Sequence, residues 1–430
     1  MNINTVTVIG ANGTLGKEIS GIFASFGNAK VYMVARTKEK AELARKEAAF
    51  SVKALSVEEN LIPKTYEDLK SCIKESDIIF ESIVEDYDEK KKLHEKINDF
   101  VSENSIIATG TSGLSIDKLA ESYSIEKRKR FVGIHFFNPP YSLTLCEIIP
   151  SKYNNDDLEF ISDLRLYLNN CLRRDSIIVK DKPAFLANRI GFKMMNEALQ
   201  LAYEYRKYGG IDYIDAILGA YTGRSMAPIE TVDFVGLDIH RAIVNNIYDK
   251  ATEKEKKSFK LPEYMNELIE NKQVGAKVRC GLYKTNVGDN NKLVYDIETK
   301  QYRNIKEYNF EFKNKAIECF KKAKYYNGIQ EIINDTSNES NICMKFLLKY
   351  IVYALETANL VAENVTDCDI AMATGFNWIP PFALIKALGG NKNVVDMCQK
   401  YLEKQFKYDE IMNKEIDSIY DYRKFLKARE

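Results

Sequence analysis

The stretch Val6-Thr7-Val8-Ile9-Gly10-Ala11-Asn12-Gly13-Thr14-Leu15-Gly16 decides how the first part of the chain folds. A β-branched run leads into a glycine-rich turn, and the helical pattern 16–26 follows. Glycines allow a tight turn and let the backbone approach a pyrophosphate, which then meets the free N–H groups of the helix. We therefore predict a dinucleotide site; a purely structural turn is the alternative. Its predicted contacts are Gly10, Asn12, Gly13, Leu15 and Gly16.

Short β-branched runs alternate with helical patterns through the first 180 residues. Further runs lie at 31–34, 78–84, 106–108, 132–134 and 177–179, and 90–101 is a helical pattern between two of them. Alternation of this kind is typical of a mostly parallel sheet covered on both faces. We predict an α/β fold in which residues 1–182 form a Rossmann-like domain.

Beyond Pro183 long helical patterns replace the alternation, beginning at 185–207, and predict an all-α region. Gly223-Arg224-Ser225-Met226-Ala227-Pro228 is echoed by Gly375-Phe376-Asn377-Trp378-Ile379-Pro380, which indicates two similar helical units. We place these units at 183–310 and 311–430. The polar stretch 286–304 is predicted to form a surface hairpin or insertion.

The end of the second run bears on the cofactor. It reads Val34-Ala35-Arg36-Thr37, with no carboxylate to grip a ribose 2′-hydroxyl. An arginine at this position can pair with a 2′-phosphate instead. NAD or NADP is therefore the expected cofactor, with NADP favoured, and an Arg36 that stacks on adenine or stays solvated is the alternative.

Composition excludes several other classes of protein. The 62 basic residues equal the 62 acidic ones, so bulk charge does not indicate a nucleic-acid partner. No apolar run is long enough to span a membrane, and the first residues do not resemble a signal peptide. The eight cysteines are scattered, without the spacing of a metal site. We predict a cytoplasmic protein without bound metal.

A histidine and a glutamate lie twelve residues apart near the end of the first domain. His135 ends a strand before Pro139-Pro140, at the carboxyl edge of the predicted sheet, where open α/β folds bind ligands. Glu147 lies in an apolar run, where a charge needs a partner. His94 lies among lysines and is predicted to be solvated, so His135 is the expected partner. A purely structural histidine is the alternative.

Several stretches resemble the 3-hydroxyacyl-CoA dehydrogenase family. They are Gly133-Ile134-His135-Phe136-Phe137-Asn138-Pro139 followed by Glu147, Asp181-Lys182-Pro183-Ala184-Phe185-Leu186-Ala187-Asn188-Arg189 followed by Asn196-Glu197-Ala198, the stretch 226–238, and Gly275-Ala276-Lys277 with Gly281-Leu282-Tyr283. The turn at Gly375 is similar to that of a second helical unit. The resemblance covers nearly the whole chain, in order.

The resemblance implies an oxidoreductase that interconverts 3-hydroxyacyl-CoA and 3-ketoacyl-CoA by hydride transfer with NAD(P), so that an acyl-CoA is its substrate. His135 would be the general acid and base, and Glu147 would orient its imidazole. Ser112 matches the serine that hydrogen-bonds the reacting oxygen, and Asn188 matches the asparagine from the helical domain. Glu85 and Lys90 match a pair near the nicotinamide; a salt bridge at a helix start is the alternative.

Three departures from the family pattern concern the cofactor and the acyl chain. Gly110-Thr111-Ser112-Gly113-Leu114 lacks the family's asparagine, the glycine loop is one residue longer, and 140–144 is more polar than usual. The acyl-chain preference therefore stays open. The competing hypotheses are another NADP-dependent hydroxy-acid dehydrogenase and a non-catalytic NADP-binding sensor. A homodimer through the helical domain and a monomer both fit.

Overall fold

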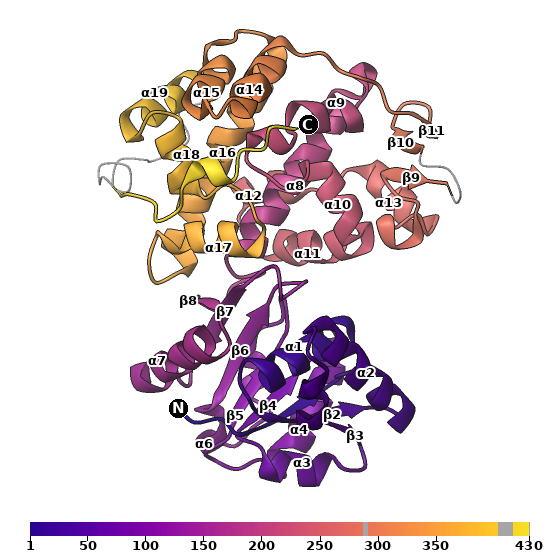
Figure 1. The fold of residues 1–430 in the computed structure, drawn as a ribbon, viewed down its shortest axis with the longest axis vertical. Coiled ribbons are helices and arrows are strands. Elements are labelled where there is room, and N and C mark those ends of the chain that lie inside the picture. Colours follow the sequence, from indigo (N-terminus) through magenta and orange to yellow (C-terminus); the bar gives the residue numbers. More distant parts are fainter. Residues whose placement is uncertain (287–290, 403–415, 430) are drawn as a thin grey trace. The chain divides into compact units, whose positions relative to one another are not determined.

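The computed structural model describes residues 1–286, 291–402 and 416–429, and the chain divides into two compact units (Figure 1). The first unit is Met1–Phe185 with Val361–Glu363, and the second is Leu186–Leu360 with Asn364–Glu430. The division after residue 185 lies near the boundary predicted after residue 182. The further division at residue 310 stays a prediction, because the helical half forms one unit.

The first unit is built on an eight-stranded sheet of order β3-β2-β1-β4-β5-β6-β7-β8. Strands β1 to β6 run parallel, β7 is antiparallel to β6, and β8 is parallel to β7. The strands are β1 (Thr5–Ile9), β2 (Lys30–Ala35), β3 (Leu61–Thr65), β4 (Ile78–Glu81), β5 (Ile106–Thr109), β6 (Phe131–Phe136), β7 (Leu145–Pro150) and β8 (Asp175–Ile178). This topology confirms the predicted Rossmann-like, mostly parallel sheet.

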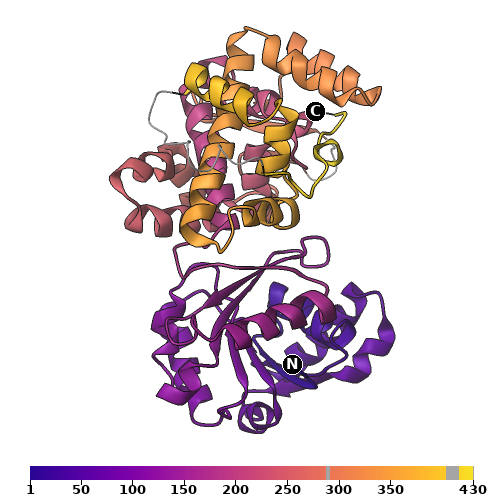
Figure 2. The same cartoon turned by 90° about the vertical axis from the view of Figure 1, so that its left-hand side faces the viewer.

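Helices cover both faces of this sheet. They are α1 (Thr14–Ser25), α2 (Lys38–Ser51), α3 (Leu69–Glu75), α4 (Tyr87–Asn98), α5 (Ile116–Ala120), α6 (Ile125–Arg128) and α7 (Leu158–Leu166). Buried side chains of α1, α2 and α7 form one core with the strands; Figure 2 looks onto the side of α7. A strand that is buried on both faces needs apolar residues at successive positions, which is why these strands read as continuous runs.

The sequence analysis did not predict strands β3 and β7, and the run that it predicted at 78–84 is longer than strand β4. β3 contains Pro63, which cannot donate to a ladder, and the strand lies at the edge of the sheet, where proline is tolerated. β7 was recognised only as an apolar run around Glu147. The predicted run 78–84 ends as a strand at Glu81, and the following helix starts at Tyr87, three residues before the predicted start.

The prediction that His94 is solvated is wrong. Its side chain is fully buried, Nδ1 lies 2.6 Å from the Tyr123 hydroxyl, and the ring packs edge-on against Phe131. Nε2 lies 3.5 Å from Oε2 of the buried Glu81, which also accepts a 2.6 Å hydrogen bond from Lys90 Nζ. Burial alone would raise the pKa of Glu81, but His94 and Lys90 hold it at about 2. Lys91, Lys92 and Lys96 are exposed on the outer face of α4, whereas His94 and Lys90 are buried.

The second unit is mainly helical. Its elements are α8 (Ala187–Glu204), α9 (Ile211–Ile217), α10 (Pro228–Val235), α11 (Leu237–Lys250), α12 (Glu253–Phe259), α13 (Glu263–Glu270), β9 (Tyr283–Thr285), β10 (Lys292–Asp296), β11 (Gln301–Asn304), α14 (Glu311–Lys321), α15 (Tyr325–Asn334), α16 (Asn338–Val361), α17 (Asp367–Gly375), α18 (Pro381–Ala387) and α19 (Asn391–Tyr401). The antiparallel pair β10–β11 is the predicted hairpin, and β9 joins it in a three-stranded sheet. The region is therefore not purely α-helical.

The predicted repeat has a counterpart in the structure, because the same capping device occurs twice. Asp215 accepts hydrogen bonds from the backbone N–H groups of Ile229 and Glu230 at the start of α10, at 2.9 and 2.8 Å. Asp369 accepts one from Phe382 N–H at the start of α18, at 2.8 Å. Both helices carry proline in the first turn, where its missing N–H costs nothing.

The two echoed turns also contact each other. Ile379 N–H donates to the Gly223 carbonyl at 2.6 Å, and Asn377 Nδ2 donates to the Ser225 hydroxyl at 2.7 Å. Gly223 has a φ of +94°, and a Cβ there would lie 2.6 Å from Ile379 side-chain atoms. The two turns that the sequence pattern marks are therefore in direct contact.

The capping aspartates predict a pH dependence of stability. Burial raises the pKa of Asp215 to about 7 and that of Asp369 to about 6. Because both values exceed that of an unfolded aspartate, the folded state binds more protons between about pH 4 and 7. These protons contribute their full stabilisation below pH 4. The free energy of unfolding then falls as the pH rises, by at most about 1.4 kcal/mol per pH unit for each proton.

Urea unfolding at pH 5 and pH 7.5 measures this effect. The difference in unfolding free energy between these pH values is expected to shrink in Asp215→Asn, which keeps one acceptor oxygen but cannot titrate. An unchanged difference in the variant would contradict the assignment to Asp215.

Within residues 1–286, 291–402 and 416–429, none of the helices combines the length and apolar character needed to cross a membrane.

Candidate active site

The glycine turn between β1 and α1 has the geometry of a dinucleotide cradle. Gly10 has a φ of +82°, and a Cβ there would lie 2.3 Å from the Ser82 carbonyl oxygen, so only glycine fits. Its N–H and that of Ala11 donate to the Val34 carbonyl at 3.0 and 3.1 Å, which fixes the turn against β2. The turn thus brings bare backbone to the start of a twelve-residue helix, as a pyrophosphate requires.

The other predicted contacts of this turn serve different purposes. A Cβ on Gly16 would lie 2.4 Å from the Gly10 carbonyl oxygen, so this glycine lets α1 pack closely on the turn. Gly13 is the N-cap residue of α1, and Asn12 beside it is exposed. Leu15 is half-buried against the core, which gives its side chain a packing role. Cofactor contacts of these four residues stay predictions.

Arg36 follows the last residue of β2 and is exposed. Among the residues that the structure describes, its guanidinium has no hydrogen-bond or ion-pair partner. All of its donors are therefore available to a ligand at the carboxyl edge of β2, which is where the ribose of a bound dinucleotide lies in this fold.

His135 and Glu147 form a buried pair. They face each other across the antiparallel ladder of β6 and β7, and Nδ1 of His135 lies 2.8 Å from Oε2 of Glu147. His135 is 3% exposed and Glu147 is fully buried. The antiparallel register of the two strands puts both residues in one pair. The carboxylate can only accept, so Nδ1 carries the proton and Nε2 has a free lone pair.

The free side of the imidazole meets Ser112. Nε2 of His135 lies 3.2 Å from the Ser112 hydroxyl, which follows the end of β5. Phe137 and Phe185 pack on the histidine ring, with centroids 4.6 and 5.6 Å away. The arrangement is an oriented imidazole whose Nε2 lies next to a hydroxyl group, at the carboxyl edge of the parallel strands. It suits proton transfer to and from a bound hydroxyl or carbonyl.

Glu85 and Lys90 lie near each other but do different things. Glu85 Oε1 accepts hydrogen bonds from the Thr111 hydroxyl and the Ser112 N–H, at 2.5 and 2.9 Å, so it holds the loop that carries Ser112. Lys90 is buried, and its main partner is Glu81 at 2.6 Å, with Glu85 at 3.5 Å. The predicted salt bridge therefore exists, and a direct cofactor contact of either residue stays a prediction.

Sequence reasoning missed Glu81, the centre of this buried polar cluster. It accepts hydrogen bonds from Lys90, from the Thr109 hydroxyl at 2.7 Å and from the Ile83 N–H at 2.7 Å. A carboxylate directly after Ile78-Ile79-Phe80 was an available signal, of the same kind as the one that singled out Glu147.

Asn188 belongs to the second unit. It lies in the first turn of α8 and is 8% exposed. Its participation in a site with His135 stays a prediction.

The chain matches both domain models of one family. The model of the 3-hydroxyacyl-CoA dehydrogenase NAD binding domain covers residues 5–181, and that of the C-terminal domain covers residues 185–285. Mitochondrial hydroxyacyl-coenzyme A dehydrogenase of Sus scrofa is 30% identical over 297 residues, which are 66% of this chain and 91% of that protein. The chain belongs to the 3-hydroxyacyl-CoA dehydrogenase family.

Longer members of the family match as well. A Bacillus subtilis protein named "Probable 3-hydroxyacyl-CoA dehydrogenase" is 31% identical over 338 residues, 76% of this chain and 41% of that protein. The chain spans about half the length, or less, of several such relatives. The crystal structure of 3-hydroxybutyryl-CoA dehydrogenase from Escherichia coli K12 has the same fold, with a TM-score of 0.72 at 19% identity over 96% of this chain and 98% of that one.

Proposed function

We propose that this member of the 3-hydroxyacyl-CoA dehydrogenase family interconverts a 3-hydroxyacyl-CoA and the 3-ketoacyl-CoA with a nicotinamide dinucleotide. The observation that carries the proposal is the buried pair of His135 and Glu147, whose free nitrogen lies beside Ser112. A protein that only binds a dinucleotide has no need of an imidazole oriented in this way.

His135 is the general base of oxidation and the general acid of reduction. Nε2 takes the proton from the substrate 3-hydroxyl, or returns it to the ketone oxygen in the reverse direction. Glu147 keeps the proton on Nδ1 and stabilises the imidazolium that forms when Nε2 is protonated as well. Because both side chains are buried, their interaction is stronger than it would be in water.

Ser112 and Asn188 position the reacting oxygen. The Ser112 hydroxyl is within hydrogen-bond distance of Nε2, so an oxygen bound at the histidine meets this hydroxyl as well. Glu85 fixes the Ser112 backbone and thereby the direction of the hydroxyl. Asn188 is proposed to complete the site from the helical unit.

The glycine turn is proposed to hold the dinucleotide. Gly10, Gly13 and the first turn of α1 would contact the pyrophosphate, and Arg36 would contact the adenosine ribose. When bound, the nicotinamide supplies the hydride acceptor or donor. The family model is described as NAD binding, and the unpaired Arg36 is the feature that favours a 2′-phosphate.

Oxidation of NADH and NADPH by acetoacetyl-CoA tests the reaction and the cofactor together. We expect turnover with both cofactors and a higher kcat/KM with NADPH. Arg36→Ser is expected to lower kcat/KM for NADPH at least about tenfold and to leave that for NADH within about twofold, because only the charged pair with the 2′-phosphate is lost. Lys40→Ser, at an exposed position on α2, is the matched control.

The possible results separate the two parts of the proposal. A higher kcat/KM with NADH in the unmodified protein would overturn the assignment of Arg36 but keep the reaction. Absence of turnover with acetoacetyl-CoA and with longer and branched 3-ketoacyl-CoA substrates would overturn the reaction itself.

A further inference from the structure

The helical unit contains a second concave region, made only of its own residues. Two adjoining cavities of about 590 and 420 Å³ lie among α8, α12 and α16, in the size range of small-molecule sites. They share five lining residues, which are Glu197, Lys257, Ser258, Lys345 and Lys349. The proposed active site uses none of these five, so the region is not explained by the proposed reaction.

The floor of the larger cavity is formed by buried ions. Lys193 and Glu197, one turn apart on α8, have side chains that are each 9% exposed and are joined by a 2.7 Å ion pair. Glu197 also accepts the Ser258 hydroxyl at 2.7 Å and lies 3.6 Å from Lys349 Nζ. Burial alone would raise the pKa of Glu197, but Lys193 and Lys349 lower it to about 2. This carboxylate is therefore ionised and fully engaged.

A second carboxylate of the floor is engaged as well. Glu255 pairs with Arg189, whose side chain is 7% exposed, at 2.8 Å, and accepts the Tyr353 hydroxyl at 3.2 Å. Glu197 is engaged with Lys193 and Lys349 and Glu255 with Arg189, so neither carboxylate neutralises the other two rim lysines, Lys257 and Lys345.

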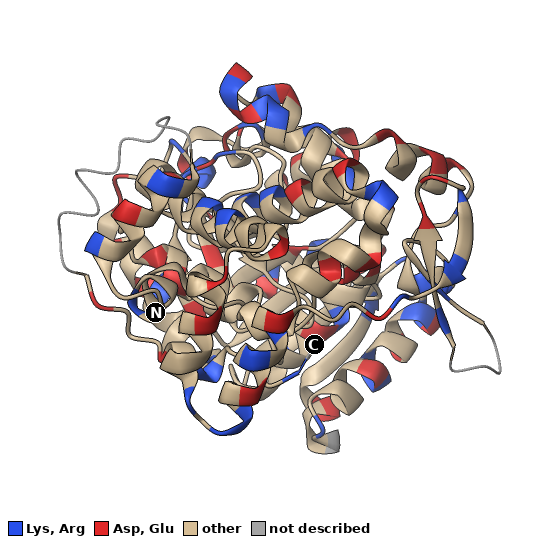
Figure 3. Ribbon diagram, turned by 90° about the horizontal axis from the view of Figure 1, so that it is seen from above, with Lys and Arg blue, Asp and Glu red and all other residues tan. Residues whose placement is uncertain are grey.

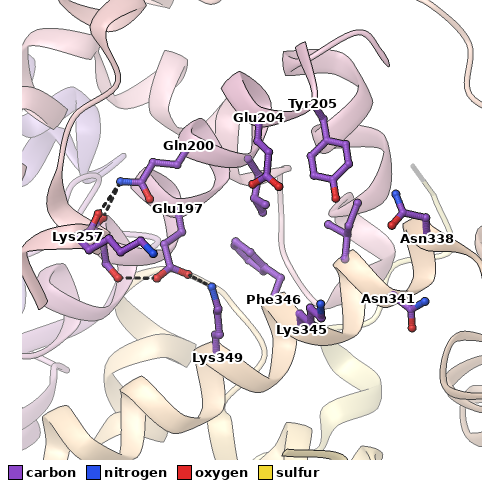
Figure 4. Close-up of a pocket in the computed structure, with 13 residues that line it drawn as sticks. Glu197, Gln200, Glu204, Tyr205, Lys257, Asn338, Asn341, Lys345, Phe346 and Lys349 are labelled. Atoms are coloured by element: carbon purple, nitrogen blue, oxygen red, sulfur yellow. Dashed lines mark hydrogen bonds and ion pairs between the residues drawn. The ribbon is translucent and has the colours of Figure 1, made fainter. Parts of the chain in front are cut away.

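The rim carries the excess positive charge. Lys257 of α12 and Lys345 of α16 are exposed, and in the described part of the chain neither has a carboxylate within ion-pair distance. Figure 4 shows both beside Lys349 and Glu197, with Asn341 further along the same helix as Lys345. The two cavities are lined by six cations, Arg189, Lys193, Lys254, Lys257, Lys345 and Lys349, against four carboxylates, Glu197, Glu204, Glu255 and Glu356.

This local excess is not a consequence of the overall composition. The whole chain has a formal net charge of zero. Seen from above, basic and acidic residues are interspersed over the ribbon (Figure 3). The two surplus cations are concentrated in one region, and their positive charge favours the binding of an anion there.

We propose that this region, the lysine cavity, binds an anion of nucleotide size that carries two or more phosphate groups. Lys257, Lys345 and Lys349 contact the phosphates at the rim, and the ionised floor keeps Lys193 and Arg189 in place below them. Gln200, Asn338 and Asn341 in the smaller cavity offer hydrogen bonds to a sugar or base. The phosphates belong either to a free nucleotide or to the 3′-phosphorylated ADP head of coenzyme A.

Calorimetric titration of the full chain with inorganic pyrophosphate and with ADP tests the proposal. The double variant Lys257→Gln/Lys345→Gln removes two rim charges without touching the buried floor. Lys207→Gln/Lys324→Gln makes the same change at exposed positions outside both cavities. We expect the Kd for both probes to rise at least about tenfold in the first variant and to stay within about twofold in the second.

The same titrations can contradict the proposal. If the unmodified protein and the rim variant had equal Kd values, the phosphates would bind outside the lysine cavity, for example at the glycine turn. That result would overturn the proposal. Absence of binding of both probes to the unmodified protein would do so too. Because binding is measured as heat, failure of the proposed reaction leaves this test unaffected.

A second pair of probes distinguishes the source of the phosphates. The first probe, 3′-phosphoadenosine 5′-diphosphate, reproduces the head group of coenzyme A. The second probe, ADP, differs from it only in lacking the 3′-phosphate. If the first probe binds at least about tenfold more tightly than ADP, and the rim variant loses this difference, the lysine cavity is assigned to coenzyme A. Equal affinities, both weakened in the rim variant, assign it to a free nucleotide.

Discussion

Replacing His135 by glutamine is expected to lower kcat for acetoacetyl-CoA reduction by about three orders of magnitude. Glutamine is close in size and can still hydrogen-bond to Glu147, so the strands β6 and β7 keep their register. It has no group that can accept and release a proton at neutral pH. Binding of the dinucleotide, followed by fluorescence, is expected to stay within about twofold, because His135 acts on the substrate hydroxyl.

His240→Gln is the matched control for this substitution. His240 is fully buried in α11, and burial lowers its pKa to about 3, so it is neutral and takes no part in the proposed reaction. Thermal unfolding of both variants separates a loss of fold from a loss of chemistry. If His135→Gln kept more than a tenth of the unmodified kcat, the assignment of His135 as the acid and base would be wrong.

Replacing Glu147 by glutamine is expected to lower kcat by at least about a hundredfold. The carboxylate, fully buried and 2.8 Å from Nδ1 of His135, can only accept a hydrogen bond. A carboxamide can donate instead, which lets the imidazole carry its proton on Nε2 and removes the lone pair that the reaction needs. The variant also loses the negative charge that stabilises the imidazolium.

Glu147→Asp distinguishes a chemical role from a packing role. Glutamine preserves the volume of the buried side chain, whereas aspartate leaves a small cavity but keeps the charge. Under the proposed function Glu147→Asp retains the higher kcat of the two variants, even if it unfolds at a lower temperature. The opposite order, with glutamine as the more active variant, would mean that Glu147 serves packing alone.

The features that could be predicted from the sequence are those that depend on residues close together in the chain. The glycine turn after β1 and the alternation of strands and helices follow from residues that are neighbours in the chain, and both were identified. The contact of His135 with Glu147 was also predicted, because a carboxylate in an apolar run needs a partner, although β7 itself was not recognised as a strand.

Features that combine distant segments were not predictable in the same way. The prediction for His94 was wrong because most of the nearby lysines are exposed, and only the three-dimensional fold brings Glu81 and Tyr123 to the histidine. The lysine cavity joins α12 and α16, whose rim lysines 257 and 345 are far apart in the chain. The same holds for β3, because the edge position that tolerates Pro63 is set by the order of the strands in the sheet.

The interlocked turns of the helical repeats constrain how this chain can change over evolutionary time. A Cβ on Gly191 would lie 2.3 Å from the ring of Phe376, just as one on Gly223 would meet Ile379. A larger residue at position 191 is therefore tolerable only with a smaller one at 376, whereas Gly223, with a φ of +94°, admits no larger residue without backbone strain. Among homologous sequences with both helical units, positions 191 and 376 should therefore vary as a pair, whereas position 223 should stay glycine whatever residue stands at 379.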